Sequence, residues 1–148
     1  MKKIILVLVV IAVAVGAIGF YLWNKPSEYV SDGKPDYTIS LIELTNDGKN
    51  LSDSIFGTKY VGKAIQFEAE VESVADNKGA KTLTLKTNDD GLVVNAGFHE
   101  SIADKLSKIV SGDKVKLQCD CSGVTKPESE DDLLSEIEIN LTRCNLIK

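Results

Sequence analysis

Residues 64–72 read AIQFEAEVE, and this stretch decides the fold class. Apolar side chains at Ile65, Phe67, Ala69 and Val71 alternate with polar or charged ones. A period of two places the apolar groups on one face of an extended chain and the charges on the other. The stretch therefore predicts an antiparallel strand with one buried face and one exposed face.

Four further strands are expected downstream, at residues 82–87, 92–98, 115–121 and 137–141. The turn sequences DNKG (76–79) and DDG (89–91) separate the first three strands. From Ile102 to Val110 apolar residues recur every three or four positions, which predicts an amphipathic helix, and Gly112 follows where a helix C-terminus favours a left-handed residue. Three strands, a helix and two more strands match the OB-fold, a five-stranded Greek-key barrel with its helix between strands 3 and 4.

A short helical region is expected before the barrel. Ser40 and Glu43 have the spacing of a capping box, which predicts that a helix begins there. The sequence NDG at 46–48 is expected to end that helix. Residues 51–60 then predict a second short helical turn, with Ile55, Phe56 and Tyr60 as its apolar contacts.

An uncharged run of 20 residues, 4–23, follows Lys2 and Lys3. A helix of this length is about 30 Å long, which matches the hydrocarbon core of a membrane. The two lysines favour a cytoplasmic N-terminus, with the rest of the chain outside the cytoplasm, in the periplasm or at the cell surface. A cleaved signal peptide is the alternative, since the small residues at 12–14 and 15–17 have workable cleavage spacing. We favour a retained transmembrane helix, because the apolar run continues past both sites.

These signals divide the chain into an anchor or signal peptide (1–24), a linker with Pro26, Gly33 and Pro35 (25–36), and one OB domain (37–148). Lys2, Lys3 and Lys25 all flank the apolar run. The remainder holds 14 basic and 22 acidic residues, a net charge of −8. Such a surface repels phosphate backbones and disfavours nucleic acid as a partner.

The chain resembles the tRNA-anti-like OB-fold proteins, which are small exported bacterial proteins. The similarity lies in the Lys-Lys-led apolar start, in KYVGK (59–63) before the first strand, in SGDKVKL (111–117), in CSG (121–123) and in LTRC (141–144). The chain departs from the family at residues 94–96, which read VNA where such proteins often have a cysteine. The resemblance implies an OB-fold behind a membrane anchor and carries over no activity and no cofactor.

Cys119, Cys121 and Cys144 are the three cysteines, and export permits a disulfide. The resemblance implies a pair between Cys121 and Cys144 that joins the last two strands, with Cys119 left as a buried apolar side chain. The pair Cys119–Cys144 and three free buried thiols remain open as alternatives. We expect no metal site, since one residue separates Cys119 from Cys121 and zinc ligands usually have two to four between them.

No catalytic constellation is expected, and we predict that the protein is not an enzyme. His99 is the only histidine, and nothing near it in sequence supplies a nucleophile, so a polar cap or a surface role is favoured. The sequence also lacks a phosphate-cradling glycine loop and a nucleophile elbow.

The favoured function is a non-catalytic binding module, tethered to the membrane, for an unknown protein, glycan or small-molecule ligand. Single-stranded nucleic-acid binding is the alternative, and it needs a basic groove with aromatic rings. Phe67 and Phe98 fall on the inner faces of predicted strands, and glutamates line the outer side of the first strand. The expected binding regions are the face that bears Gln66 and Thr84 and the loop at 126–132.

Overall fold

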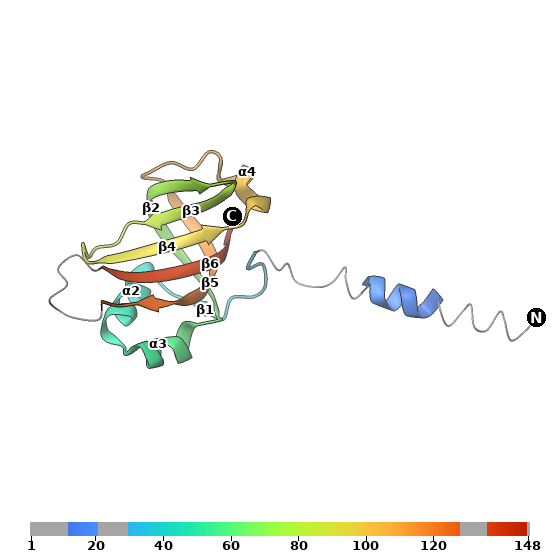
Figure 1. Cartoon of the computed structure of the whole chain (residues 1–148), viewed down its shortest axis with the longest axis horizontal. Coiled ribbons are helices and arrows are strands. Elements are labelled where there is room, and N and C mark those ends of the chain that lie inside the picture. The colour runs from blue at the N-terminus through green and yellow to red at the C-terminus, as the bar shows by residue number, and fades with distance from the viewer. Residues whose placement is uncertain (1–11, 21–29, 128–135, 148) are drawn as a thin grey trace, which may run out of the picture.

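The computed structural model describes residues 12–20, 30–127 and 136–147, and every structural statement below concerns those residues. The domain begins with a two-residue strand and two helices, and five long strands follow, interrupted once by short helical turns (Figure 1). The elements are β1 (Tyr37–Thr38), α2 (Leu41–Asn50), α3 (Asp53–Tyr60), β2 (Ala64–Asn77), β3 (Ala80–Leu85), β4 (Leu92–Phe98), η1 (Glu100–Ile102), α4 (Ala103–Leu106), β5 (Lys114–Thr125) and β6 (Ile137–Leu146).

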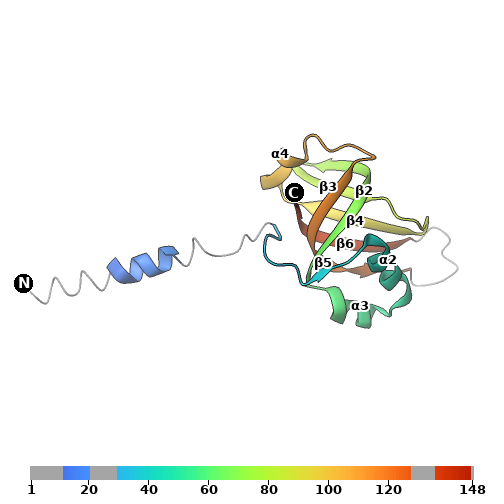
Figure 2. The ribbon, with the colours of Figure 1, turned by 180° about the vertical axis from the view of Figure 1, so that it is seen from behind.

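The five long strands close into a barrel. Their order is β2-β3-β4-β6-β5, and β5 pairs again with β2 (Figure 2). The first half of β2 pairs with β5 and the second half pairs with β3, with a register shift between Val71 and Ser73. β4 and β6 are parallel and the other barrel pairs are antiparallel. The predicted OB-type barrel is confirmed.

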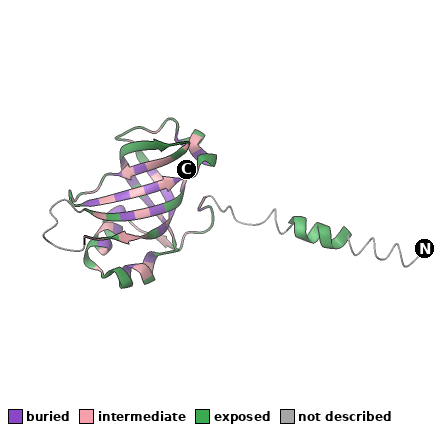
Figure 3. Ribbon diagram, viewed as in Figure 1, coloured by how far each residue is buried: buried purple, intermediate pink, exposed green. Residues whose placement is uncertain are grey.

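Buried side chains alternate with more exposed ones along β4 and along the first half of β2, as the bands along the ribbon show (Figure 3). Residues 72–77, in the second half of β2, are all exposed. The apolar positions predicted for the first strand, Ile65, Phe67, Ala69 and Val71, are all buried. Helices α2 and α3 lie at one end of the barrel, and α4 lies at the other (Figures 1 and 2). The barrel is therefore a filled core, and a ligand would have to bind on its outside.

Both predicted N-terminal helices form, and each begins at a serine cap. The Ser40 hydroxyl accepts the Glu43 amide at 3.1 Å, and the Ser52 hydroxyl accepts the Ile55 amide at 3.4 Å. These bonds satisfy amides that have no partner within the first turn of a helix.

The expected end of the first helix at NDG (46–48) is wrong, because α2 continues to Asn50 and buries Gly48 against Ile139. Phe56 and Tyr60 of α3 are buried as predicted, but Ile55 is exposed.

The helix predicted at 102–110 is wrong in extent. A 3₁₀ turn and one α-helical turn end at Leu106, because the next residues are bound to β2 and to their own turn. The Gly112 amide donates to the Val71 carbonyl at 2.7 Å, and the Val110 amide donates to the Asp113 carboxylate at 3.0 Å. Gly112 has the expected positive φ of 92°, but it serves the turn into β5 and does not end the helix.

Residues 12–20 of the apolar N-terminal run are helical and exposed. No helix within the described ranges is long and apolar enough to cross a membrane. The rest of the predicted anchor, 4–11 and 21–23, lies outside the described residues.

Candidate functional site

The outer face of β3, β4 and β6 is the candidate site, because OB-folds bind ligands over their second and third barrel strands, which are β3 and β4 in this chain. Small polar side chains hydrogen-bond across it. The Thr84 hydroxyl donates to Asn95 Oδ1 at 3.3 Å, and Asn95 Nδ2 donates to the Glu138 carboxylate at 3.3 Å. One side chain from each of the three strands thus forms a polar row.

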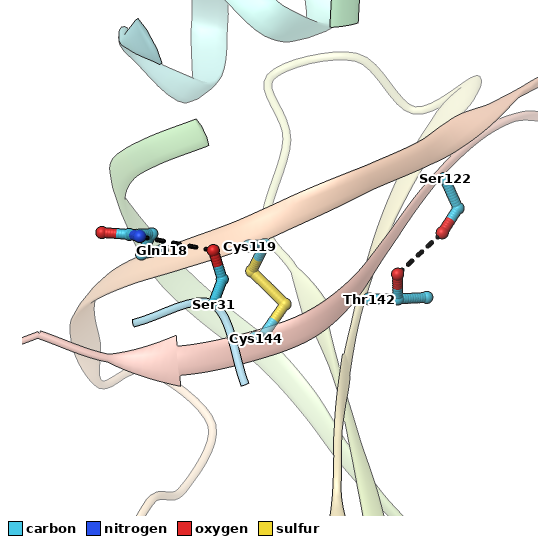
Figure 4. Close-up of a disulfide and its surroundings, with 6 residues drawn as sticks. All are labelled: Ser31, Gln118, Cys119, Ser122, Thr142 and Cys144. Atoms are coloured by element: carbon cyan, nitrogen blue, oxygen red, sulfur yellow. Dashed lines mark hydrogen bonds between the residues drawn. A yellow bond between two sulfur atoms is a disulfide. The ribbon is translucent and has the colours of Figure 1, made fainter. Parts of the chain in front are cut away.

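A cavity of about 300 Å³ lies on this face near the end of the barrel that carries α4. The residues that line it are Ala80, Lys81, Thr82, Gly97, Phe98, His99, Thr142 and Arg143. Gly97 lies so near the neighbouring strand that an added Cβ would stand 3.4 Å from the Leu141 carbonyl oxygen. The Thr142 hydroxyl at its edge lies 2.8 Å from the Ser122 hydroxyl of β5 (Figure 4).

His99 is the N-cap of η1, which confirms the predicted capping role. Its Nδ1 accepts the Ser101 amide at 3.1 Å and lies 3.1 Å from the Ser101 hydroxyl. Both contacts join residues two apart in the chain. The bond to the Ser101 amide gives a partner to an amide that has none within the first turn of a helix.

Arg143 lies in a bulge of β6 and has a positive φ of 52°. Its Nη1 forms an ion pair with Asp120 on β5 at 2.8 Å, and its Nη2 donates to the Val30 carbonyl at 3.4 Å. Its own carbonyl accepts the Ser31 amide at 2.6 Å. Arg143 therefore connects the cavity to the segment that enters the domain from the N-terminus.

That segment, residues 30–36, lies on the outside of β5, and we call it the strap. The buried Gln118 side chain holds it, with Nε2 donating to the Ser31 hydroxyl at 3.3 Å and to the Gly33 carbonyl at 2.7 Å (Figure 4). At the far end of the strap, the Asp36 amide donates to the Ala64 carbonyl at 2.8 Å. The strap crosses from β6 to β2 and covers an outward-facing side chain of β5.

The predicted disulfide between Cys121 and Cys144 is wrong. Cys119 pairs with Cys144, with Cα atoms 4.1 Å apart, and Cys121 is a buried free thiol (Figure 4). The register explains the choice. Cys121 lies opposite Leu141, three residues from Cys144, a distance of about 10 Å that a disulfide cannot bridge. The bulge at Arg143 places Cys144 opposite Cys119, one of the alternatives left open above.

The structure does not bring together the residues expected to form the binding face. Gln66 pairs in register with Gln118 of β5, whereas Thr84 pairs with Ser73 of β2 and Asn95 of β4. Lys126, at the start of the expected binding loop, donates to the Leu51 carbonyl and lies 3.5 Å from the Asp53 carboxylate. Residues 128–132 of that loop lie outside the described residues.

Sequence reasoning missed Asn95, Glu138 and Arg143. Asn95 and Glu138 occupy outward positions of their strands, which the alternation does mark, but it does not show that two distant strands are neighbours. Within the described ranges no three histidine, cysteine or carboxylate side chains gather as a metal site. Phe67 and Phe98 are buried, as predicted, so neither offers a ring to the candidate face.

Comparison with solved structures supports the fold. The chain is similar to a lipoprotein from Klebsiella pneumoniae subsp. pneumoniae with a provisional assignment as nucleic-acid binding, at 12% identity and a TM-score of 0.56, over 75% of this chain and 91% of that one. It is less similar to an aspartyl-tRNA synthetase assigned in Leishmania major, at 13% identity and a TM-score of 0.43 over 82% of this chain. The chain spans only 23% of the length of that synthetase.

No protein-family model matches the chain, and no curated protein matches it. The similarity to the Klebsiella lipoprotein therefore shows the fold alone. Membership of the tRNA-anti-like family stays a prediction.

Proposed function

We propose that the protein is a non-catalytic OB-fold binding module, held outside the cytoplasm by an N-terminal membrane anchor. The observation that carries this proposal is the polar row of Thr84, Asn95 and Glu138 beside the cavity, on the barrel face over which OB-folds bind ligands. Both barrel ends carry helices, and this face is built by three neighbouring strands at once. Its donors and acceptors suit a protein, a glycan or a polar small molecule.

Export is supported by chemistry as well as by the apolar run. A structural disulfide persists in oxidising compartments and is rare in the cytosol, and Cys119 and Cys144 form one. The structurally similar Klebsiella protein is a lipoprotein. A membrane-anchored binding domain in the periplasm or at the cell surface fits both observations.

Single-stranded nucleic acid is the weaker candidate. It is favoured by the provisional assignment of the Klebsiella protein. Against it stand the net charge of −8 after the anchor and the lack of an aromatic side chain among the outward residues of β3 and β4, which are Ala80, Thr82, Thr84, Val93, Asn95 and Gly97. Stacking platforms and basic grooves are what sequence-tolerant single-strand binders use.

The test is site-specific photo-crosslinking of the full chain in intact cells. A photoreactive residue at Thr84 is expected to capture a ligand or partner, whereas one at exposed Glu43 on α2 is the matched control. Capture at both positions, or at neither, contradicts the assignment of the site to the β3–β4–β6 face.

A titration of the detergent-solubilised full chain with labelled single-stranded DNA and RNA at about 50 mM salt decides the alternative. Saturable binding with a dissociation constant of about 10⁻⁶ M or below, weakening with salt, overturns our proposal in favour of nucleic-acid binding.

A further inference from the structure

Arg143 belongs both to the cavity and to the docking of the strap. It lines the cavity beside Thr142 and Gly97. Its side chain donates to the Val30 carbonyl at 3.4 Å, and its own carbonyl accepts the Ser31 amide at 2.6 Å. One residue thus has contacts in both places, and a change at either place acts on it.

The backbone of Arg143 is held in a conformation that an arginine rarely adopts. Its φ of 52° lies in the left-handed region, where the backbone crowds a Cβ. Residues other than glycine persist there only where their surroundings hold them. The two bonds to the strap are part of those surroundings, together with the ion pair to Asp120. Loss of the strap should therefore allow the bulge to relax.

Relaxation of this bulge would move one edge of the cavity. The parallel pairing of β4 with β6 ends at Ala96 and Leu141. Three residues further along β6, Cys144 is fixed to β5 by its disulfide. Thr142 and Arg143 are the two residues of β6 between these fixed points, and both line the cavity. The part of β6 that depends on the bulge is therefore the part that shapes the cavity.

The strap is held weakly enough to open while the barrel stays folded. Ser31 is buried, whereas residues 32–34 and Asp36 are exposed. Segments with few buried apolar contacts open locally at a free energy well below that of global unfolding. Gln118 supplies two of the bonds that keep the strap docked (Figure 4). The strap therefore has a docked state and an open state, and Arg143 is held only in the docked one.

We propose that the strap regulates the cavity. The docked strap holds Arg143 in the bulge that shapes the cavity, and opening of the strap lets the bulge relax and changes the cavity. This inference deepens the proposed function and rests on it, because the cavity belongs to the candidate face. A ligand that binds the docked form would in turn hold the strap closed, since coupling between two sites is reciprocal.

The experiment follows backbone amides of the full chain in detergent micelles, without any ligand. Gln118→Ala removes two bonds to the strap, and the Ser31 amide is expected to exchange with solvent about tenfold faster. The amide resonances of Gly97 and Thr142 are expected to shift in the same variant. Lys34→Gln is the matched control, because it changes an exposed residue of the strap and should leave all three amides unchanged.

Arg143→Gly tests whether the bulge carries the coupling. Glycine adopts a positive φ without crowding, so the bulge should persist in this variant when the strap opens. When Gln118→Ala is added to Arg143→Gly, the Ser31 amide should again exchange faster, but Gly97 and Thr142 should keep their positions in the spectrum. Shifts as large as those in the arginine background would overturn the proposal.

Three other outcomes also overturn it. Faster exchange of Ser31 with unshifted Gly97 and Thr142 shows that the strap and the cavity are independent. Unchanged exchange of Ser31 in Gln118→Ala shows that Gln118 does not hold the strap. Exchange of Ser31 no faster than that of the fully buried Leu83 shows that the strap does not open separately from the barrel.

The outcome is distinguishable from that of the proposed function. Photo-crosslinking at Thr84 tests the candidate face and uses no variant of the strap. A failure of the coupling therefore leaves the binding module in place, and a failure of the crosslinking leaves the measured amide shifts in place.

Discussion

Asp47 joins the two N-terminal helices through one carboxylate oxygen. Oδ2 accepts Lys59 Nζ at 2.6 Å and the hydroxyl of the fully buried Tyr60 at 2.6 Å. The bonds from Lys59 and Tyr60 lower the pKa of the Asp47 carboxyl, and burial raises the pKa of the Tyr60 hydroxyl, as does its bond to Asp47. A buried hydroxyl and a surface ammonium thus share one charged acceptor.

Replacing Asp47 by Asn should destabilise the fold. A hydrogen bond to a charged group contributes about 1.5–3 kcal/mol, and the variant should lose about that much free energy of unfolding at neutral pH. Because the folded pKa of Asp47 is lowered, this stability is present above the unfolded pKa of about 3.9 and is lost as the pH falls through the folded value. Urea unfolding followed by circular dichroism at neutral and acid pH measures both effects. Asp89→Asn, which breaks an exposed pair with Lys49, is the control and should cost less.

Cys121 should be unreactive in the folded protein. Burial raises the pKa of its thiol to about 11, so at pH 8 only about one thiol in a thousand is ionised. Iodoacetamide should not modify the native chain, and it should modify Cys121 alone when the chain is denatured without reductant. Modification of Cys119 under those conditions would show that the other pairing exists.

Lys78 and Gly79 form the two-residue turn between β2 and β3, and both have positive φ, 54° and 96°. Such turns favour Asn followed by Gly, because a lysine Cβ is crowded in the left-handed conformation. Lys78→Asn should therefore stabilise the domain by about 0.5–1 kcal/mol in thermal unfolding. Lys78→Ala keeps the crowded Cβ and should give no such gain; an equal gain from alanine would refute the explanation.

The disulfide joins β5 to β6 and closes a loop with a sequence separation of 25 residues. Loop-closure entropy predicts that it stabilises the domain by about 3.5 kcal/mol. The double variant Cys119→Ser, Cys144→Ser should unfold at correspondingly lower urea concentration. Cys121→Ser is the control, because it leaves the disulfide intact. A double variant as stable as the parent would show that the cross-link does not constrain the unfolded chain.

The barrel strands could be predicted because β4 and the first half of β2 keep a period of two, and the helix start at Ser40 because the spacing of a capping box is local. The cap at Ser52 was not predicted. The cysteine pairing could not be predicted from the sequence. The bulge at Arg143 breaks the period of two in β6, so that Leu141 and Cys144 are both buried although they are three positions apart, and the register shifts change which residues of β5 and β6 face each other. The candidate row of Thr84, Asn95 and Glu138 depends on the parallel β4–β6 pairing, which joins residues more than forty positions apart in the chain.

The strap joins the N-terminal segment to the barrel. Residues 25–36 resemble a plain linker in sequence, but residues 30–36 are hydrogen-bonded to the barrel. Gln118→Ala removes the two side-chain hydrogen bonds to Ser31 and Gly33. The unfolding free energy should fall by about 1–2 kcal/mol, and the Ser31 amide should exchange with solvent much faster. Gln66→Ala, on the strand opposite, is the control and should leave the exchange of Ser31 unchanged. Equal exchange in both variants would show that Gln118 does not hold the strap.

The position of the cross-link also has a mechanical consequence. A force applied through the N-terminus reaches the barrel at Ser31, whose amide is bound to the carbonyl of Arg143, the residue next to Cys144. The chain between the two paired cysteines cannot be extended while their covalent bond is intact. In a single-molecule pulling experiment the oxidised domain should therefore release a contour length about 85 Å shorter than the reduced one, which corresponds to the sequence separation of 25 between the paired cysteines.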